Sequence, residues 1–536
     1  MTLADTQYGP VRGTTVDPDD RTASSGSSSR STTSSSGDWS ASPSDRSTAG
    51  SPSGSPASSS SGASEVLVFK GIPYAAAPVG VDRFRPPRAP EVWDRPLDAT
   101  DYGPTAPQSR AEGDLADFAP RMVIPGDDYL NLNVWTPGLT GKAPVMVFIH
   151  GGSFTSGSGA LSVYDGTHFA RDGVVLVTIN YRLGADGFLW FGEGSPNLGL
   201  LDQVAALTWV RDNIANFGGD PGNVTVFGES AGAMSVCTLL AMPAAEGLFH
   251  RAIAQSGAAA NTIGPDTARI VANRLADVLG TAPTREAIAA VPMDRLIAAQ
   301  EQLSQQAAAK PRAKVWGDVA RTLLPFSPVV DGDVLPAPPL DRIRAGAAAN
   351  IDLLVGSNSE EARLFFVPTG VGARINVPLL YLGAAMRFGL PARGVRRYRA
   401  NRPGATPGDV LAAIMTDSYY RIPALRLAEA QPGTYVYEFA WRSPACNGQL
   451  GASHVVELPF VFDNLDDPAT ATLLGLAPPQ HLADLVHKSW IDFATTGNPG
   501  WRPYTSGNRL SRHFASASGT TTNDRPTERR LWTHRR

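Results

Sequence analysis

The sequence predicts an α/β protein with one large, mostly parallel central sheet flanked by helices. From residue 65 onward, short apolar segments rich in Val, Ile and Phe alternate with segments of helical length, a pattern typical of parallel α/β sheets. Several of these segments have no polar face, as expected of strands that helices cover on both sides. The expected strands are VLVF, LNVW, VMVFI, VVLVTI, VTVF, AIAQS, DLLV and TYVYEF, and the clearest helices are NLGLLDQVAALTWVRDNIANF and PDTARIVANRLADVLG.

A serine-rich segment, residues 18–64, interrupts this pattern near the start of the chain. Its few large apolar groups would bury too little surface to offset the entropy lost on ordering. The sequence before it, TQYGPVRGTTVD, is typical of a strand with a Gly-Pro turn, and VLVFKGIPYA after it is strand-like again. We therefore expect residues 18–64 to be a disordered insertion between two neighbouring strands, which costs little in loop entropy.

Composition narrows the range of functions. The formal net charge of −4 provides no basic field for nucleic acid, and the basic ending ERRLWTHRR is expected to be a solvated tail. The two cysteines, Cys237 and Cys446, are too few for a disulfide framework and are expected to be free thiols, as in a reducing cytosol. The first residues show no signal peptide, and no apolar run reaches the ~18 residues of a membrane span. We expect a soluble, cytoplasmic protein that binds neither membrane nor nucleic acid.

One stretch, VTVFGESAGAMS, has a serine between two glycines directly after a predicted strand. Residues 228–232 fit the pattern G-x-S-x-G, and a helix-forming segment follows them. A strand-to-helix turn this tight has room only for glycine on either side of the serine, which is left at the apex in a strained conformation. Free N–H groups at the N-terminus of the helix favour a developing anion. The pattern predicts that Ser230 is a nucleophile.

A serine hydroxyl needs a base to become a nucleophile, and the base needs an acid to orient it. In this arrangement the acid and then a histidine follow the serine along the chain, each in a loop after a later strand. His454 is the best candidate base because it lies in a Gly- and Ser-containing loop shortly after TYVYEF. The other downstream histidines are expected on a helix surface, His481 and His487, or in a polar tail, His513 and His534.

Two further features complete the candidate site. The acid is Glu360 or Glu361, because both follow the buried-looking strand in IDLLVGSNSEEARLFF, and the pattern alone does not separate them. The segment HGGSF, residues 150–154, follows another predicted strand, and its small residues let backbone N–H groups approach an acyl oxygen. Each such donor contributes about 2.7–4 kcal/mol to the stability of a transition state. Together these parts predict nucleophilic chemistry on an acyl group.

The chain is similar to the type-B carboxylesterase family, which includes bacterial para-nitrobenzyl esterases and the cholinesterases. The resemblance implies an α/β-hydrolase fold, with one domain over residues 1–536 and helical insertions over the pocket. It also implies a serine carboxylesterase that acts on a small-molecule ester and needs no metal or organic cofactor. The matching motifs are FKGIPYAAAPVG, RFRPP, DDYLNLNVWTP, IHGGSF, NYRLGADGF, NLGLLDQVAALTWVRDNIANFGGDPGNVTVFGESAGA, AQSGA, SNSEEARLFF, SHVVELPFVF and WIDFATTGNP.

The resemblance also assigns roles to individual residues. By this resemblance Ser230 is the nucleophile, His454 the general base and Glu361 the acid. Ser256, in AQSGA, resembles a further serine that family members have near the base. The implied oxyanion donors are backbone N–H groups, those of Gly152, Ser153 and Ala231.

The chain departs from the family pattern at three positions. Ala362 stands where the family has a glycine after its acidic pair, and Ser153 stands where Gly or Ala is more common. Tyr129 replaces a cysteine whose disulfide closes a loop in many secreted relatives, which agrees with a cytosolic enzyme. The segment between Asp98 and Tyr129 also has no tryptophan, so the aromatic cage that cholinesterases use for quaternary ammonium is not expected.

Other functions are compatible with the same sequence. A lipase, or a hydrolase of carbamates or other xenobiotic esters, would use the same triad, because the pocket walls set the substrate. A non-catalytic adhesion-type relative would keep only the fold, and the sequence does not decide between monomer and homodimer. Four aromatic residues fit either a substrate pocket or the core, namely Phe154, Phe188, Phe365 and Phe366. Because the base must be neutral, activity is expected to fall below the pKa of His454, ordinarily about 6.5.

Overall fold

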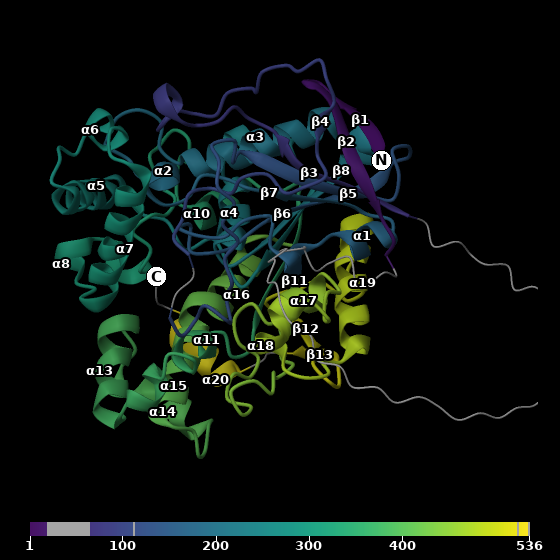
Figure 1. Ribbon diagram of the computed structural model, residues 1–536. Helices are drawn as coiled ribbons and strands as arrows, with labels where there is room; N and C mark the ends of the chain where they lie inside the picture. Colours follow the sequence, from purple (N-terminus) through teal and green to yellow (C-terminus); the bar gives the residue numbers. More distant parts are fainter. Residues whose placement is uncertain (19–64, 111–112, 523–524, 534–536) are drawn as a thin grey trace, which may run out of the picture.

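One continuous sheet organises the molecule. The computed structural model describes residues 1–18, 65–110, 113–522 and 525–533, and in these residues thirteen strands form one sheet. Their order is β1-β2-β3-β5-β7-β6-β8-β9-β10-β11-β12-β13, with β4 beside β2 (Figure 1). The strands are β1 Thr2–Thr6, β2 Gly9–Val16, β3 Val66–Pro73, β4 Leu97–Asp98, β5 Asn131–Thr136, β6 Ala143–Ile149, β7 Val175–Ile179, β8 Gly219–Glu229, β9 Arg251–Gln255, β10 Asp352–Asn358, β11 Tyr435–Phe439, β12 Leu510–Phe514 and β13 Gly519–Thr522.

The centre of the sheet is parallel, and its two ends are antiparallel. From β7 through β6, β8, β9, β10 and β11 to β12, each strand pairs in parallel with the next. The antiparallel pairs lie from β1 to β7 and at β12–β13. The predicted fold class is confirmed, and each of the eight expected strands is present. The carboxyl ends of the parallel strands meet at one edge, where ligand sites of such sheets lie.

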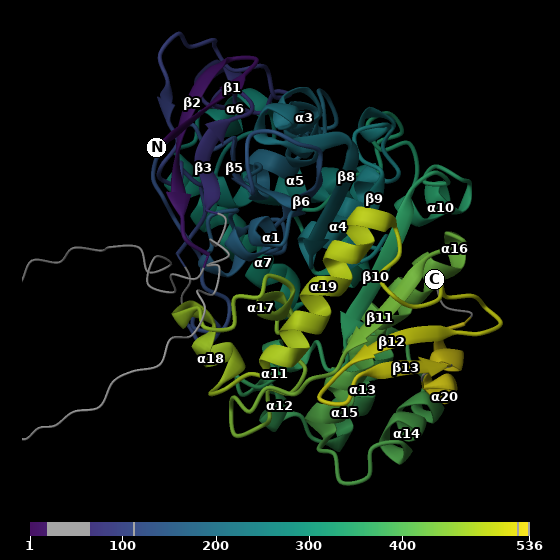
Figure 2. The same cartoon turned by 90° about the vertical axis from the view of Figure 1, so that its right-hand side faces the viewer.

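The helices of the described residues cover both faces and one end of this sheet (Figures 1 and 2). Both helices expected from the sequence are present, as α3 and α5. The helices are α1 Thr167–Arg171, α2 Gly184–Phe188, α3 Leu198–Asn213, α4 Ala231–Leu239, α5 Pro265–Leu279, α6 Arg285–Ala289, α7 Met293–Ala309, α8 Ala313–Trp316, α9 Val319–Thr322, α10 Pro339–Arg344, α11 Arg363–Phe366, α12 Val371–Arg374, α13 Val377–Phe388, α14 Ala392–Ala400, α15 Pro407–Thr416, α16 Ile422–Ala430, α17 Leu458–Val461, α18 Ala471–Leu474, α19 Gln480–Thr496 and α20 Pro526–Arg529.

Alternate residues of the central strands enter different hydrophobic cores. In β6, Val145 and Val147 pack into the core that contains α3, α4, α5 and α7. Met146 and Phe148 point to the other face and pack into the core that contains α1, α17 and α19. This alternation follows from the period of two along a strand. Because helices cover both faces of the sheet, the sequence of β6 is a continuous run of apolar residues.

A third, smaller core lies outside the two sheet faces. It joins α13, α14 and α15 through buried side chains that include Leu380, Tyr398 and Ile414. These helices form the end of the molecule that lies away from β1 and β2 (Figures 1 and 2).

The strands on either side of the serine-rich segment are neighbours, as predicted. β2 and β3 pair antiparallel, with Val16 opposite Val66. The predicted disorder of residues 18–64 lies almost wholly outside the described residues. The predicted Gly-Pro turn is wrong. Gly9 and Pro10 are the first residues of β2, and the hairpin turn lies before Pro10, between Thr6 and Gly9.

The C-terminal region is more structured than the sequence indicates. His513 lies in β12, with Nε2 3.0 Å from Glu438 Oε2, rather than in a polar tail. The basic ending contributes α20 and a 3-10 turn, in which Glu528 and Trp532 are buried. The expected solvated tail, residues 528–536, is therefore wrong for residues 528–532, and residues 534–536 lie outside the described residues.

Two other expectations concern thiols and membranes. Cys237 and Cys446 are both free, as predicted, and Cys237 is buried. Among the described residues, none of the helices combines the length and the apolar character that crossing a bilayer requires.

A fully buried ion pair fixes α3 against the end of β7. The side chains of Arg182 and Asp202 have no exposed surface. Arg182 donates from Nε to Asp202 Oδ2 at 2.8 Å and from Nη2 to Oδ1 at 2.7 Å. Its backbone N–H donates to the same carboxylate at 3.0 Å.

Replacing Arg182 by methionine is expected to leave Asp202 buried without its partner. We expect the Arg182→Met change to lower the free energy of unfolding by about 3–5 kcal/mol, measured by urea denaturation. The control is Arg211→Met, which breaks the exposed pair of Arg211 with Asp212 and is expected to cost less than about 1 kcal/mol. Equal losses in the two variants would contradict this account.

Candidate active site

Ser230 lies at a sharp turn between β8 and α4. β8 ends at Glu229 and α4 begins at Ala231, so that a single residue joins strand to helix. Ser230 has φ 55° and ψ −120°, a sparsely populated region for any residue other than glycine. A Cβ atom on Gly232 would lie 1.9 Å from the carbonyl oxygen of Ile149. Only glycine fits at that position, because α4 starts directly against the end of β6.

The loop that follows β6 passes beside this serine. A Cβ atom on Gly151 would lie 3.1 Å from Ser230 Cβ and 2.9 Å from the carbonyl oxygen of Glu229. Ser153 and Phe154 have φ values of 56° and 61°, which are uncommon outside glycine. The HGGSF segment therefore lies beside Ser230, and two of its residues have an uncommon backbone conformation.

His454 lies in the loop after β11 and contacts the second of the two candidate acids. His454 Nδ1 is 2.6 Å from Glu361 Oε2, and the side chains of both residues are buried. The other oxygen of Glu361 accepts a hydrogen bond from the backbone N–H of Asn358 at 2.7 Å. Glu360 instead pairs with Arg363 and Arg442 near the surface. The structure thus separates two residues that the sequence pattern leaves equivalent.

The departure from glycine at position 362 has no structural cost. Ala362 has φ −68° and ψ −9°, which any residue adopts without strain. Its backbone N–H donates to Thr416 Oγ1 at 3.2 Å. The choice of Glu361 over Glu360 is therefore not weakened by Ala362.

Two further buried glutamates surround His454, and the sequence reasoning did not find their role. His454 Nε2 lies 3.1 Å from Glu229 Oε1, an oxygen that has no hydrogen-bond partner among the described residues. Glu457 accepts hydrogen bonds from Asn358 Nδ2 at 2.5 Å and Gln255 Nε2 at 3.4 Å. His454 and Glu457 lie in the turn before α17, where Val455 has φ 63°, so no helical spacing in the sequence indicates this neighbour.

These carboxyl groups change the proton affinity of the site. Burial acts to lower the pKa of His454, but the charges of Glu229 and Glu361 outweigh it and raise that pKa from 6.5 to about 9. Burial raises the pKa of Glu229 well above its ordinary value. Burial, with the charge of Glu361, also raises the pKa of Glu457 to about 7. The pKa of His454 is therefore higher than the ordinary histidine value expected from the sequence.

Ser230 and His454 open into the same pocket, whose volume is about 300 Å³. Its floor holds Glu229 and the glycines of the HGGSF segment, while its walls are mostly apolar. The apolar lining residues include Leu115, Phe118, Leu161, Val163, Phe365, Leu458 and Leu473.

Only one of the four aromatic candidates lines this pocket. Phe365 does, and its ring centroid is 5.6 Å from that of His454. Phe154 and Phe188 pack on each other in the core, with centroids 4.8 Å apart. Phe366 packs against the third core.

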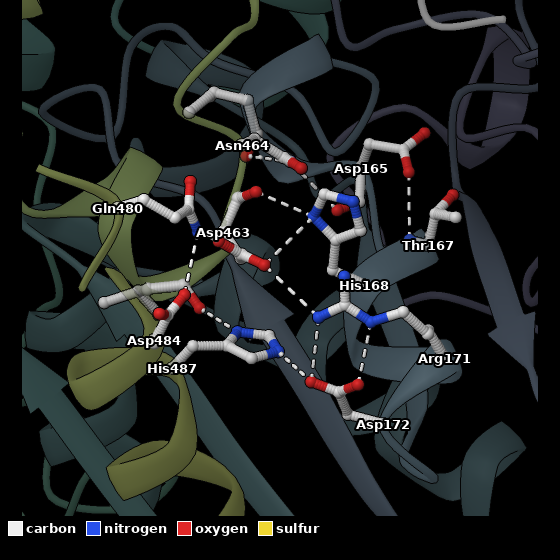
Figure 3. A network of polar contacts seen from close by, with 12 residues as sticks. Asp165, Thr167, His168, Arg171, Asp172, Asp463, Asn464, Gln480, Asp484 and His487 are labelled. Carbon is white, nitrogen blue, oxygen red and sulfur yellow. Dashed lines mark hydrogen bonds and ion pairs between the residues drawn. The ribbon is translucent and has the colours of Figure 1, made fainter. Parts of the chain in front are cut away.

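A polar network behind the pocket wall holds residues 458–473 in place (Figure 3). His168 Nδ1 lies 2.7 Å from the carbonyl oxygen of Asp463, and Arg171 donates to the Asp463 carboxylate at 3.2 Å. Asn464 donates to the carbonyl oxygens of Val163 and Asp165, each at 3.1 Å. Two segments that line the pocket, one before α1 and one after α17, are thereby joined.

His487 also belongs to this network, although it was expected on a helix surface. It does lie on α19, as predicted, but its side chain is buried. His487 Nδ1 lies 2.7 Å from the carbonyl oxygen of Val461, and Nε2 lies 3.4 Å from Asp172 Oδ2. Neither His487 nor His481 is among the residues that line the pocket.

The remaining predicted residue, Ser256, follows β9. Its φ is 52°, its side chain is buried, and its Oγ has no hydrogen-bond partner among the described residues. A Cβ atom on the next residue, Gly257, would lie 2.4 Å from the carbonyl oxygen of Ser230. The turn at Ser256 thus packs directly against the serine turn.

Comparison with known proteins shows the family of the chain. A profile of the carboxylesterase family matches residues 46–376. The chain is 40% identical to the para-nitrobenzyl esterase of Bacillus subtilis over 449 residues, which cover 80% of this chain and 86% of that protein. The chain belongs to the carboxylesterase family. It is also 36% identical to the phenmedipham hydrolase of Pseudarthrobacter oxydans, over 81% of this chain and 87% of that protein.

Solved structures give the same result for this carboxylesterase. The crystal structure of a carboxylesterase from Geobacillus stearothermophilus matches it with a TM-score of 0.80 and 35% identity. The match covers 99% of this chain and 100% of that chain. The protein is a serine carboxylesterase with an α/β-hydrolase fold, and it hydrolyses carboxylic esters. The alternative of a non-catalytic relative is therefore set aside.

The contact between Glu229 and His454 predicts the pH dependence of this carboxylesterase. A histidine that acts as a base must be neutral, so a raised pKa places the fall in activity at higher pH than an ordinary histidine would. Glu229→Gln removes the carboxyl group that lies 3.1 Å from Nε2 and whose charge raises the pKa of His454, so this pKa is expected to fall. We expect the acidic limb of kcat/KM to move to lower pH by about one unit or more.

The control for this prediction is Glu360→Gln. Glu360 pairs with arginines rather than with His454, so its removal is expected to leave the limb in place. The pH of half-maximal kcat/KM is measured, not the maximal rate, because Glu229→Gln also changes the pocket floor. An unshifted limb in Glu229→Gln would show that Glu229 does not set the pKa of the base.

Proposed function

We propose that Ser230, His454 and Glu361 form the catalytic triad of this carboxylesterase. The observation that carries this proposal is the pairing of His454 with Glu361 at 2.6 Å, in the same pocket that Ser230 lines. Glu361 orients the imidazole through Nδ1 and leaves Nε2 facing the pocket floor. Nε2 is then the atom that takes the proton of the Ser230 hydroxyl.

The backbone N–H groups of Gly152, Ser153 and Ala231 form the oxyanion hole in this proposal. Two observations support it: the HGGSF segment leaves too little room for a side chain between Gly151 and Ser230, and Ala231 is the first residue of α4. The first N–H groups of a helix have no partner within the helix, and they favour negative charge. A serine at position 153 keeps the backbone donor that a glycine or alanine would supply.

Hydrolysis then proceeds in two steps. Ser230 Oγ attacks the ester carbonyl while its proton moves to His454 Nε2, and the carbonyl oxygen becomes an anion held by the three N–H groups. The tetrahedral intermediate collapses, the C–O bond to the alcohol breaks, and the alcohol leaves with the proton from His454. Water attacks the acyl-enzyme with His454 again as base, which releases the acid and restores Ser230.

The pocket favours esters with compact apolar groups. Its volume of about 300 Å³ is small for long acyl chains, and leucine, valine and phenylalanine side chains make up much of its walls. This supports a carboxylesterase acting on small esters over a lipase. A carbamate substrate would use the same nucleophile, and one relative is named for phenmedipham hydrolysis.

The wider organisation of the protein is part of the proposal. The single sheet from β1 to β13 supports one α/β-hydrolase domain over residues 1–536, with the serine-rich segment inserted in it. The cytoplasmic location stays a prediction from the sequence, as does independence from cofactors and nucleic acid.

Ser230→Ala is expected to remove turnover of short p-nitrophenyl esters. Loss of the nucleophile is expected to lower kcat by roughly 10⁴-fold or more. Ser153→Ala is the paired variant, because it deletes a hydroxyl in the same pocket and keeps the backbone N–H. We expect it to change kcat less than about 10-fold, in contrast to the 10²–10³-fold loss typical of a missing oxyanion donor. Turnover that persists in Ser230→Ala, in protein shown to be folded by circular dichroism, would mean that Ser230 is not the nucleophile.

A further inference from the structure

One segment of the chain has a charge opposite to that of the whole protein. Residues 362–408 contain eight arginines and no Asp, Glu, Lys or His. The protein as a whole has a formal net charge of −4, so the remainder of the chain is the more strongly acidic part. A concentration of one sign of charge on one structural unit indicates a partner of the opposite sign.

The segment folds as one structural unit at one end of the molecule. It contains α11, α12, α13 and α14, and the last two of these pack on α15 around the third core (Figures 1 and 2). On α13, Leu380 and Ala384 are buried in that core, and on α14, Val395 and Tyr398 are. The opposite faces of both helices are left to solvent.

Most of the arginines of the segment point to solvent without an acidic partner. Three are engaged: Arg363 with Glu360 and Asp409, Arg402 with Glu528, and Arg387 with backbone carbonyl oxygens. The other five are exposed, and the described part of the chain supplies no ion pair to any of them. They are Arg374, Arg393, Arg396, Arg397 and Arg399.

The same unit exposes a row of large apolar side chains. Leu379, Leu382 and Met386 are 43%, 53% and 78% exposed, and their spacing places them on one face of α13. Val371 and Val377, beside them in sequence, are 40% and 41% exposed. A face that a monomer leaves to water is normally polar, so an apolar row of this kind marks an interaction site.

The unpaired arginines and the apolar row of α13, taken together, favour one of three classes of partner. A nucleic acid or an acidic protein would account for the arginines but would leave the apolar row of α13 without a role. A second copy of the chain, placed face to face, would bring the unpaired arginines of one copy against those of the other. An anionic lipid surface accounts for both, since arginine side chains pair with lipid phosphates while leucine and methionine enter the acyl boundary.

We propose that the exposed faces of α12, α13 and α14 form a docking surface for an anionic lipid bilayer. Binding is peripheral: the apolar row enters the headgroup region, and the arginines contact anionic headgroups. This departs from the sequence expectation that no membrane is a partner. It is independent of the catalytic assignments, because none of the exposed residues of this surface lines the ester pocket.

The test is flotation of the full-length protein with lipid vesicles. Vesicles of phosphatidylcholine alone are compared with vesicles that contain phosphatidylglycerol. We expect the protein to bind the anionic vesicles about 10-fold or more tightly than the neutral ones, with binding that weakens as salt is added. Equal binding to both, or binding to neither, would overturn the proposal.

Two variants divide the surface into its charged and apolar parts. The triple change Arg396→Glu, Arg397→Glu and Arg399→Glu is expected to lower affinity for anionic vesicles by about 10-fold or more. The double change Leu382→Ser and Met386→Ser is expected to weaken binding even at low salt. Unchanged vesicle binding in either variant would overturn the proposal for the part of the surface that the variant removes.

A third variant controls for total charge. Arg269→Glu, Arg285→Glu and Arg344→Glu change the net charge by the same amount at exposed positions on other helices. We expect this control to keep its vesicle binding, and a loss equal to that of the first triple variant would overturn the assignment to α14. Hydrolysis of a soluble short-chain ester at the wild-type rate shows that each variant is folded.

Two other outcomes would assign the surface to a different partner. A dimer in light scattering that the Leu382→Ser and Met386→Ser change dissociates would identify a second copy as the occupant. Binding to a soluble polyanion such as polyglutamate, without binding to anionic vesicles, would identify an acidic macromolecule. Either result would overturn the proposal of a lipid surface.

Discussion

The close contact between α4 and the end of β6 is the constraint on which the candidate site depends. The absence of a side chain at Gly232 lets the helix begin against the carbonyl of Ile149, so the chain turns from strand to helix within one residue. That turn holds Ser230 at φ 55° and ψ −120°. It also brings two other loops to the same point, the HGGSF segment after β6 and the turn at Ser256 after β9. The strain at these loops, which costs of order 1–3 kcal/mol at each such residue, is held by the parallel sheet beneath them.

The second determinant of the site is electrostatic. One buried histidine lies among three buried glutamates, and Glu361 and Glu229 approach opposite nitrogens of its ring. Burial, together with the neighbouring carboxylates, raises the pKa values of Glu229 and Glu457, and the charges of Glu229 and Glu361 raise that of His454. The charge of the site is therefore a property of the whole cluster, which explains why His454 does not have the pKa of an isolated imidazole. The apolar pocket strengthens this coupling, because charges interact more strongly where water is excluded.

Features that depend on a local sequence pattern are predicted from the sequence. Features that depend on contacts between segments distant in the sequence are missed. Strand composition and the G-x-S-x-G pattern are enough to predict the central strands and the turn at Ser230. Adjacent residues such as Glu360 and Glu361 share one pattern, and only the turn after β10 directs one inward and the other to Arg442. His487 has the surroundings of a surface helix in sequence, but α17 and Phe169 of α1 pack against it in the structure and bury it. Tertiary packing of this kind leaves no local signal.

The account stands on Ser230 being the residue that becomes acylated, and one measurement tests this directly. The purified protein is treated with a fluorophosphonate ester, which phosphonylates an activated serine and forms a stable adduct. Intact mass spectrometry followed by peptide mapping then locates the adduct. The account predicts one adduct per chain, on Ser230, formed in step with loss of esterase activity. An adduct on another residue, or inactivation without modification of Ser230, would contradict it.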